Sequence, residues 1–289
     1  MIIIDYSAIA LASVFINKTN DEDMIRHMVL NTIKMYRTRF KEEYGEVVLA
    51  VDSSSWRKEL FPQYKANRKK ARDEKSGPFK NLDWNESFRI VNLIHEEIKE
   101  NFPYKVVHVE GCEGDDIIGT LVEDSQEFGK NEPIMIIAAD KDFIQLQKYN
   151  NVKQFSPLTK KFVTDPNPRL YLLNQILSGD SGDGIPNVLS ADNTFVDGLR
   201  QTPLTKKTKD VLKAKFSGDV TFEGVEDSVH RNYSRNKMLI DLSETPQELK
   251  SKIIDTYEKQ NQWENKGKVF PYMVTKKLNR LIEDVMEFV

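Results

Sequence analysis

The sequence contains one cysteine, Cys112, and only four histidines among its 289 residues. A lone cysteine excludes an intramolecular disulfide and a cysteine-rich zinc site, so we interpret Cys112 as a small, partly buried side chain. The histidines have no neighbours that suggest a catalytic triad, and His108 is interpreted as a core or edge residue of a strand. No apolar run reaches the roughly 18 residues that a membrane span requires, and the opening "MIII" is followed at once by an aspartate. We therefore expect a cytoplasmic protein with no membrane partner, and a monomer by default.

The net charge is only -3, but charges of opposite sign are segregated along the chain. Residues 56 to 72, "WRKELFPQYKANRKKAR", carry seven Lys or Arg against one acid, and residues 204 to 216, "LTKKTKDVLKAKF", carry five lysines against one acid. The acids collect elsewhere, at the ends of apolar runs. A concentrated acidic site beside basic tracts is suited to hold cations in one place and a polyanion around them.

Four apolar runs end in, or are soon followed by, acidic side chains. "MIIID" ends at Asp5, "EVVLAVD" ends at Asp52, and "IMIIAADKDF" delivers Asp140 and Asp142. The fourth run, "KVVHVEG", is followed by "CEGDDIIGTL", which places three acids at the start of a predicted helix: Glu113, Asp115 and Asp116. The run before Asp140 does not alternate apolar and polar residues, which is typical of strands in a parallel sheet covered on both faces. The carboxyl ends of such strands meet at one edge, where ligands usually bind.

The chain length and the order of elements predict an α/β fold in two parts. In residues 1–178 the strands alternate with helical patterns near 21–43, 84–101 and 115–127, which indicates a mostly parallel twisted sheet flanked by helices. Residues 179–289 show helical patterns without strands and are expected to form a smaller helical domain. Its last stretch, "PYMVTKKLNRLIEDVMEFV", is predicted to be one amphipathic helix.

The acidic cluster indicates a divalent metal site. Two carboxylates about 4 Å apart repel by roughly 4 kcal/mol at an effective dielectric constant near 20, so a cluster of six or more needs counter-charge. A single aspartate at a strand end is most simply a cap, but the whole set is not explained in that way. Oxygen ligands without cysteine or a well-placed histidine favour Mg²⁺, with Mn²⁺ as a substitute, over zinc. Sites of this kind usually perform phosphoryl chemistry with two ions.

A last acidic pair, Asp180 and Asp183, lies in "SGDSGDGIPNV", which alone would be an ordinary turn. In the order Asp5, Asp52, "YKANR", "CEGDD", "ADKDFIQL" and "GDSGDGIP", however, the motifs resemble the 5′-nuclease family. That family includes flap endonucleases and the 5′-nuclease domains of bacterial DNA polymerases. The chain length, the tract "RQTPLTKKTKDVL" and the C-terminal sequence are most similar to its ribonuclease H branch in T-even bacteriophages, which places the protein in the host cytoplasm if it is phage-encoded.

The resemblance implies a 5′ to 3′ nuclease that removes RNA primers and 5′ flaps during DNA replication. It implies hydrolysis of phosphodiester bonds with two Mg²⁺ ions, leaving a 5′-phosphate. Carried over by position, it implies a first metal site made of Asp5, Asp52, Glu113, Asp115 and Asp116, with Asp140 between the two sites. The second site would consist of Asp142, Asp180 and Asp183. Some of these residues would bind metal directly and others through water.

The "YKANR" motif matches the gateway helix of the family. Lys65 and Arg68, three residues apart, are therefore expected to face the same way and to hold the scissile phosphate, while Tyr64 is expected to stack on a base. The basic tracts supply further expected contacts with nucleic acid: Arg57, Lys58, Lys69, Lys70, Arg72, Lys206, Lys207 and Lys209. A solvated basic surface helix is the alternative for the first tract, but its interleaved aromatic residues favour nucleic acid. The expected substrates are forked or 5′-flap DNA and RNA-DNA duplex.

Two features leave alternatives open. Many relatives carry a GIG hairpin after the last motif, which binds a duplex phosphate with a potassium ion, and "NVLSADNTFVDGL" lacks it, so that lysines of the second basic tract would take this contact. The C-terminal helices are expected either to contact a single-stranded-DNA-binding protein or to pack only within the core. A small-molecule metal-dependent phosphohydrolase and a non-catalytic DNA-binding replication protein are the rival functions, and magnesium-dependent cutting of branched DNA separates all three.

Overall fold

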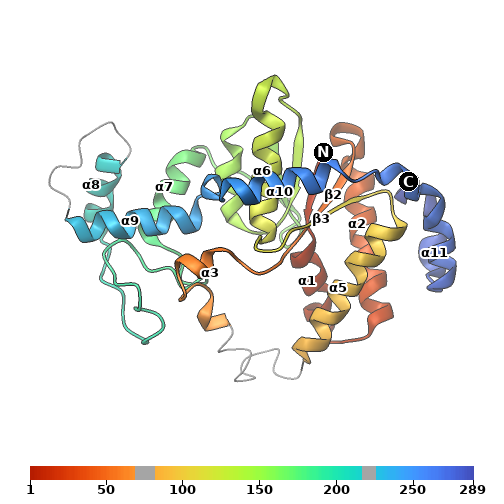
Figure 1. Ribbon diagram of the computed structural model, residues 1–289, viewed down its shortest axis with the longest axis horizontal. Coiled ribbons are helices and arrows are strands. Elements are labelled where there is room, and N and C mark those ends of the chain that lie inside the picture. The colour runs from red at the N-terminus through yellow and green to blue at the C-terminus, as the bar shows by residue number, and fades with distance from the viewer. Residues whose placement is uncertain (69–81, 217–225) are drawn as a thin grey trace.

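The centre of the molecule is one six-stranded sheet with the strand order β3-β2-β1-β4-β5-β6 (Figure 1). The computed structural model describes residues 1–68, 82–216 and 226–289. The strands are β1 (Ile2–Asp5), β2 (Val47–Val51), β3 (Lys105–His108), β4 (Ile134–Ile137), β5 (Val152–Ser156) and β6 (Lys161–Val163). The first five strands are parallel, and β6 is antiparallel at one edge. The predicted α/β fold with a mostly parallel sheet is confirmed.

Helices cover both faces of the sheet, which explains why the strands are apolar throughout. One face is covered by α1 (Tyr6–Asn17), α2 (Glu22–Tyr44) and α5 (Trp84–Asn101), and the other by α6 (Gly114–Gln126), η2 (Lys141–Lys148) and α10 (Gln247–Glu258). In β1, Ile2 and Ile4 enter the first core and Ile3 enters the second, because successive side chains of a strand point to opposite faces. The carboxyl ends of the parallel strands therefore stay free of covering helices and can hold a site.

Two further groups of elements extend the molecule at its two ends (Figure 1). One end holds α3 (Arg57–Leu60), α7 (Pro168–Ser178), α8 (Lys206–Phe216), α9 (Asp227–Ile240) and η3 (Leu242–Glu244). The opposite end holds η4 (Gln262–Lys268), α11 (Val269–Thr275), α12 (Asn279–Ile282) and η5 (Val285–Phe288), and a short helix η1 (Glu127–Gly129) follows α6. No helix in the described part of the chain is long and apolar enough to cross a membrane.

The C-terminal stretch differs from its prediction as one helix. It consists of α11, α12 and η5, and Lys277 between the first two has a φ of 54°, in the left-handed region. The break allows Leu278, Leu281 and Phe288 to be buried in the core that also holds α2 and α5. Tertiary burial, rather than helical periodicity, sets the path of this segment.

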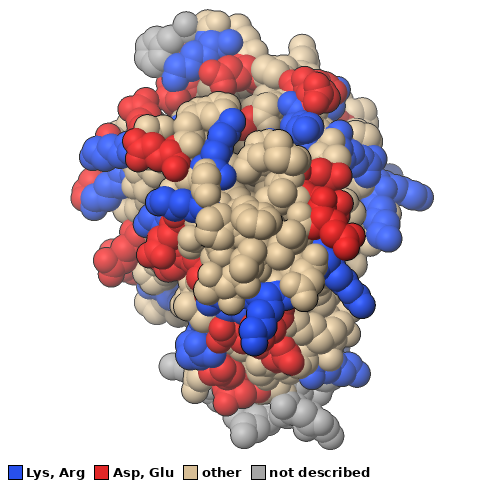
Figure 2. Space-filling view, turned by 90° about the vertical axis from the view of Figure 1, so that its right-hand side faces the viewer, with Lys and Arg blue, Asp and Glu red and all other residues tan. Residues whose placement is uncertain are grey.

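The proposed division at residue 178 remains a prediction. Both cores of the sheet also contain residues from the second part: Tyr272 and Phe288 lie in one, and Leu242 and Ile253 lie in the other. Figure 2 views the end of the molecule that carries α11, where Lys and Arg are interspersed with Asp and Glu around a central uncharged area. This end therefore carries charges of both signs, whereas basic residues predominate in the sequence of residues 56–72 and 204–216.

Candidate active site

The first group of carboxylates is fixed by the ends of β1 and β2 and the start of α6. Asp5 ends β1 and caps α1, and its Oδ1 accepts a hydrogen bond from the Ala8 amide at 3.0 Å. Asp52 follows β2, and its Oδ1 accepts a bond from the Gly114 amide at 2.6 Å. A Cβ atom at Gly114 would lie 3.1 Å from Asp52 Oδ1 and 3.8 Å from Asp5 Oδ1, so the glycine permits this close approach. Asp115, the next residue, lies near Asp5.

The second group comes from the loop after β4 and from the turn after α7. Asp140 caps η2 by accepting a hydrogen bond from the Asp142 amide at 2.9 Å. Asp180 Oδ1 accepts bonds from the amides of Gly182 and Asp183 at 2.7 and 3.2 Å, which closes the turn. A narrow pocket brings the two groups together, since its lining includes Asp115, Asp142, Asp180 and Asp183.

The electrostatics show that these carboxylates repel one another. Burial, with the neighbouring charges of Asp52 and Asp140, raises the pKa of Asp5 to about 7. Burial, with the charge of Asp140, likewise raises the pKa of Asp142 to about 7. The pKa of Asp115 is also raised well above its usual value, first by burial and then by Asp5, Asp140 and Asp142, against the opposing effect of Lys65. A cation placed among them would relieve this cost.

Two basic side chains of the "YKANR" motif face these carboxylates, which we call the acidic edge: Asp5, Asp52, Asp115, Asp140, Asp142, Asp180 and Asp183. Lys65 Nζ lies 2.6 Å from Glu113 Oε1 and 3.5 Å from Asp183 Oδ2. Arg68 Nη2 lies 2.5 Å from Asp183 Oδ1, and its side chain is 53% exposed. Burial opposes the charge of Lys65, but Glu113 and Asp183 more than offset it and raise the pKa of the ammonium. Both side chains are therefore positively charged and lie at the mouth of the acidic cluster.

The sequence predicted that helical spacing would place Lys65 and Arg68 on the same side. The structure places them in a different way. Lys65 has a φ of 56° and lies just before residues 66–68, which are helical. Its amide donates to the Asp183 carbonyl at 2.8 Å, and a Cβ atom at Gly184 would lie 3.0 Å from the Gln63 carbonyl. The motif and the Gly-rich turn are thus held together by backbone contacts, and both basic side chains reach Asp183 for this reason.

The prediction that Tyr64 stacks on a base is wrong for this structure. Tyr64 is only 3% exposed and packs with Phe61, Ile176 and Leu239. Its hydroxyl donates to Glu113 Oε2 at 2.8 Å. The ring therefore has no free face, and it supports Glu113 instead.

Glu113 is held by several hydrogen-bond donors, although Asp52 and Asp183 also lie near it. Its Oε2 also accepts hydrogen bonds from Ser55 at 2.7 Å and from Arg57 at 3.4 Å. Burial opposes ionisation, but Lys65 and these donors hold the pKa of Glu113 below its usual value. We therefore interpret Glu113 as a residue that positions Lys65.

Asp116 and Arg57 are also placed differently from the predictions. Asp116 is fully buried, and Arg57, 2% exposed, forms two bonds to its oxygens at 2.9 and 3.0 Å. The remaining capacity of Asp116 is taken by Trp56, Thr245 and the Glu113 amide. Asp116 therefore has no oxygen free for a metal, and Arg57 is not accessible to nucleic acid. The sequence does not reveal this ion pair. An acid in "CEGDD" resembles a metal ligand, and an arginine in a basic tract resembles a nucleic-acid contact, until the contact between the two is known.

The other predicted contacts with nucleic acid differ in accessibility. Lys58, Lys206 and Lys207 are exposed. Lys209 is partly buried, and its Nζ donates to Ser178 Oγ at 2.6 Å, at the end of α7. Lys69, Lys70 and Arg72 lie outside the described residues.

Sequence reasoning missed Gln175 of α7, whose Nε2 donates to Asp142 Oδ1 at 2.5 Å. A glutamine inside a helix gives no signal of such a role.

The donor set at the acidic edge fits a hard divalent cation. Its candidates offer only carboxylate oxygens, which suits Mg²⁺ or Mn²⁺. Among the described residues, the potential metal ligands whose atoms lie within 4.8 Å of one another are not these acids but His95, Glu96 and His108. The acids at the edge are more widely spaced, which suits ions that take one or two carboxylates and complete their shell with water and phosphate oxygen.

A mostly parallel α/β sheet with carboxylates at its strand ends, followed by a helical region, fits a nuclease with a resolvase-like domain. Residues 1–168 match the N-terminal resolvase-like domain of the 5′-3′ exonuclease family, and residues 167–288 match the C-terminal domain of T4 RNase H. The chain therefore belongs to the 5′-3′ exonuclease family, and it is an enzyme of the 5′-nuclease type.

Individual relatives agree with this assignment. The chain is 32% identical to a ribonuclease H of Enterobacteria phage T4, over 99% of this chain and 95% of the relative. It is 30% identical to an exonuclease of Escherichia phage T7, over 67% of this chain and 60% of the relative. A flap endonuclease of bacteriophage T5, solved with DNA and metal ions, superposes with a TM-score of 0.63 at 18% identity, over 89% of this chain and 99% of that chain, which shows a shared fold.

Proposed function

We propose that this enzyme cuts phosphodiester bonds in forked or 5′-flap DNA and in RNA-DNA duplex, and that it removes RNA primers and 5′ flaps during replication. The proposal also includes Mg²⁺ as cofactor, with two ions per site and Mn²⁺ as a substitute. The observation that carries it is the convergence of four acids on one pocket, where Lys65 and Arg68 form ion pairs with Asp183: Asp115, Asp142, Asp180 and Asp183.

The chain's own residues support binding and orientation of a phosphate. The Lys65 ammonium has three donors, so it can keep its bond to Glu113 while it binds a phosphate oxygen. Arg68, which is half exposed, offers a planar fork that matches two phosphate oxygens. A phosphate held by these two residues would lie against the acidic edge. Bound divalent metal would supply polarisation of the phosphate and an activated water there.

The carboxylates that remain candidates for metal binding follow the strand ends, begin α6 or lie in the turn after α7: Asp5, Asp52, Asp115, Asp140, Asp142, Asp180 and Asp183. Glu113 acts through Lys65, and Asp116 acts through Arg57. The residues proposed to bind metal ions are therefore different from those that hold the basic motif in place.

The partner proposals rest on surface features. Exposed Lys206 and Lys207 of α8 are suited to contact duplex phosphates in place of the missing GIG hairpin. Trp263, Phe270 and Met286 are exposed apolar side chains in the C-terminal region, which supports contact with a single-stranded-DNA-binding protein. A monomer remains our expectation for the free protein.

The deciding experiment uses a 5′-labelled forked duplex, incubated with Mg²⁺ or with a chelator and resolved on a denaturing gel. We expect short labelled products with Mg²⁺ only, and their lengths distinguish trimming of the end from cutting at the fork. Asp140→Asn should nearly abolish cutting while DNA binding is retained. Asp124→Asn is the matched control, because this residue lies near the other end of α6 and pairs with Lys130 on the surface.

Two results would contradict the proposal. Full cutting by Asp140→Asn would remove the acidic edge from the reaction. Tight binding of the fork by the wild-type protein, without cutting in Mg²⁺ or Mn²⁺, would favour a non-catalytic role in replication.

A further inference from the structure

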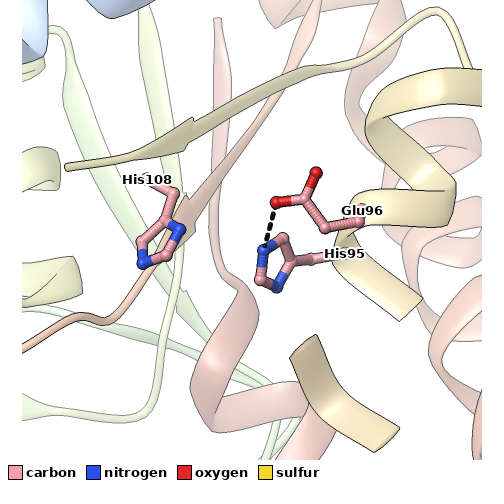
Figure 3. A group of neighbouring side chains, drawn as sticks. All are labelled: His95, Glu96 and His108. Atoms are coloured by element: carbon pink, nitrogen blue, oxygen red, sulfur yellow. Dashed lines mark hydrogen bonds and ion pairs between the residues drawn. The ribbon is translucent and has the colours of Figure 1, made fainter. Parts of the chain in front are cut away.

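A second group of metal-ligand side chains lies apart from the carboxylates proposed for cutting. His95 and Glu96 are neighbours on α5, and His108 ends the edge strand β3. One ligand atom from each of the three lies within 4.8 Å of the others. Figure 3 shows the two imidazole rings and the carboxylate gathered between the helix and the strand. The function proposed above uses none of these three residues.

His95 is held in place by the core, in the form that binds metals. It is 2% exposed, and the edge of its ring meets Tyr6 with the ring centres 5.8 Å apart. Burial lowers the pKa of His95 despite the opposing charge of Glu96, so the ring is neutral at neutral pH and offers a nitrogen lone pair. Its Nε2 lies 3.1 Å from Glu96 Oε1.

A simple hydrogen-bonded pair of His95 and Glu96 does not explain the whole group. The Nδ1 atom of His95 is buried without a hydrogen-bond partner among the described residues, which is uncommon for a buried polar atom. The ring of His108 lies 5.3 Å from the ring of His95, with the planes at 72°. A second imidazole thus approaches a pair whose hydrogen bonding is already incomplete.

We propose that His95, Glu96 and His108 bind one divalent ion of the zinc type, such as Zn²⁺, Co²⁺ or Ni²⁺, with water as a further ligand. Two imidazole nitrogens and one carboxylate oxygen form a ligand set that zinc accepts when one position stays open. With bonds of about 2.0 to 2.1 Å in a tetrahedral arrangement, the ligand atoms would be about 3.3 Å apart. Glu96 and His108 are exposed and can rotate to close this gap, while His95 stays fixed.

The ion would join α5 to the end of β3. That strand pairs only with β2 in the sheet, and His108 is in register with Val51, the residue before Asp52. A bound ion would therefore stabilise the edge of the sheet beside the acidic cluster, because an ion that binds only the folded chain shifts the folding equilibrium. Nitrogen ligands favour zinc-type ions, and the oxygen-only acidic edge favours Mg²⁺, so the two kinds of site select different metals.

The test is titration calorimetry with Zn²⁺ in excess Mg²⁺, which competes for the acidic edge. We expect one Zn²⁺ per chain in the wild type, and affinity at least about tenfold weaker in His108→Ala and in Glu96→Gln. Both residues are exposed, so the variants should fold. Glu100→Gln, the same change one turn further along α5, is the control and should bind Zn²⁺ as the wild type does.

Co²⁺ gives an independent readout, because tetrahedral coordination by the three side chains and water should produce a strong visible absorption band, which His108→Ala should lose. Unchanged Zn²⁺ affinity in both His108→Ala and Glu96→Gln would overturn the proposal. So would an absence of Zn²⁺ binding in the wild type, or loss of the same Zn²⁺ in Asp142→Asn but not in His108→Ala. None of these measurements depends on cutting of nucleic acid, so they test the zinc site independently of the proposed nuclease function.

Discussion

At the residue scale, the acids of this edge fall into two kinds according to what surrounds them. Burial, together with neighbouring acids, raises the pKa of Asp5, Asp115 and Asp142. Glu113 is lowered in pKa because basic and hydroxyl donors offset its burial. The first kind gains from an added cation, whereas the second already has its counter-charge. The distinction separates candidate ligands from supporting residues on electrostatic grounds.

This distinction predicts a pH dependence for the metal-free protein. The pKa of Asp5 and of Asp142 is raised from 3.8 to about 7, so between these values the folded state binds more protons than the unfolded state. Stability should therefore fall as pH rises through this window, and the melting temperature in chelator should be higher at pH 5.5 than at pH 8 by at least about 2 °C. Thermal unfolding at the two pH values measures this.

The corresponding variant and metal additions check its cause. Asp142→Asn should flatten the difference between the two pH values, because it removes one of the two groups. Saturating Mg²⁺ should restore stability at pH 8 in the wild type. A melting temperature in chelator that rises from pH 5.5 to pH 8 would contradict the raised pKa values.

A second prediction concerns Gln175, which positions a carboxylate without being one. It donates to Asp142 from α7, while its own Oε1 is buried without a partner among the described residues. Gln175→Ala should weaken Mg²⁺ activation about 10- to 100-fold, and activity should recover largely at saturating Mg²⁺. Asn174→Ala, the preceding residue of the same helix, serves as control. Loss of maximal activity with unchanged Mg²⁺ dependence would assign Gln175 a different role.

The sequence located the strand ends at which Asp5 and Asp52 lie, because strand ends are local features. An apolar run that stops at an aspartate identifies both the strand and the edge at which it ends, as Asp5 and Asp52 demonstrate. It could not predict which acids are already neutralised. Asp116 differs from Asp115 only in the direction of its side chain, and its partner Arg57 lies 59 positions away in the chain.

At the scale of elements, Arg57 connects α3 to two other helices. Its guanidinium bonds to Asp116 of α6, and its Nε donates to the Leu239 carbonyl of α9 at 2.8 Å. The "YKANR" motif follows α3 directly, so the position of Lys65 depends on this connection. Sequence patterns identified the helices but not the buried ion pair that joins them.

Removal of this arginine should be costly. Arg57→Met leaves Asp116 buried without a cation, which should lower the free energy of unfolding by about 3 to 5 kcal/mol. Lys58→Met, the exposed neighbour, should change it by no more than about 0.5 kcal/mol. Chemical denaturation of both variants at neutral pH measures the difference. Equal stability of the two variants would mean that the pair is not formed in solution.

At the scale of the whole molecule, the C-terminal segment completes a core that begins at the N-terminus. Phe288 is fully buried and packs against Phe102 with the ring centres 5.7 Å apart, in the same core as Ile2 and Ile4 of β1. The pattern of strands followed by helices predicted two parts. It could not reveal that the last helices return to the core that the first strand helps to form, because no local signal encodes a contact between distant segments.

This packing predicts that the sheet and the C-terminal helices unfold together. Phe288→Ala should cost about 3 to 5 kcal/mol, whereas Met286→Ala, at a side chain that is 75% exposed, should be nearly neutral. Hydrogen exchange provides the sharper measurement: amides of β1 and β2 should exchange faster in Phe288→Ala, along with those of α11, because a shared core opens as one unit. Faster exchange in α11 alone would mean that the C-terminal segment opens by itself, and that the sheet is stable without it.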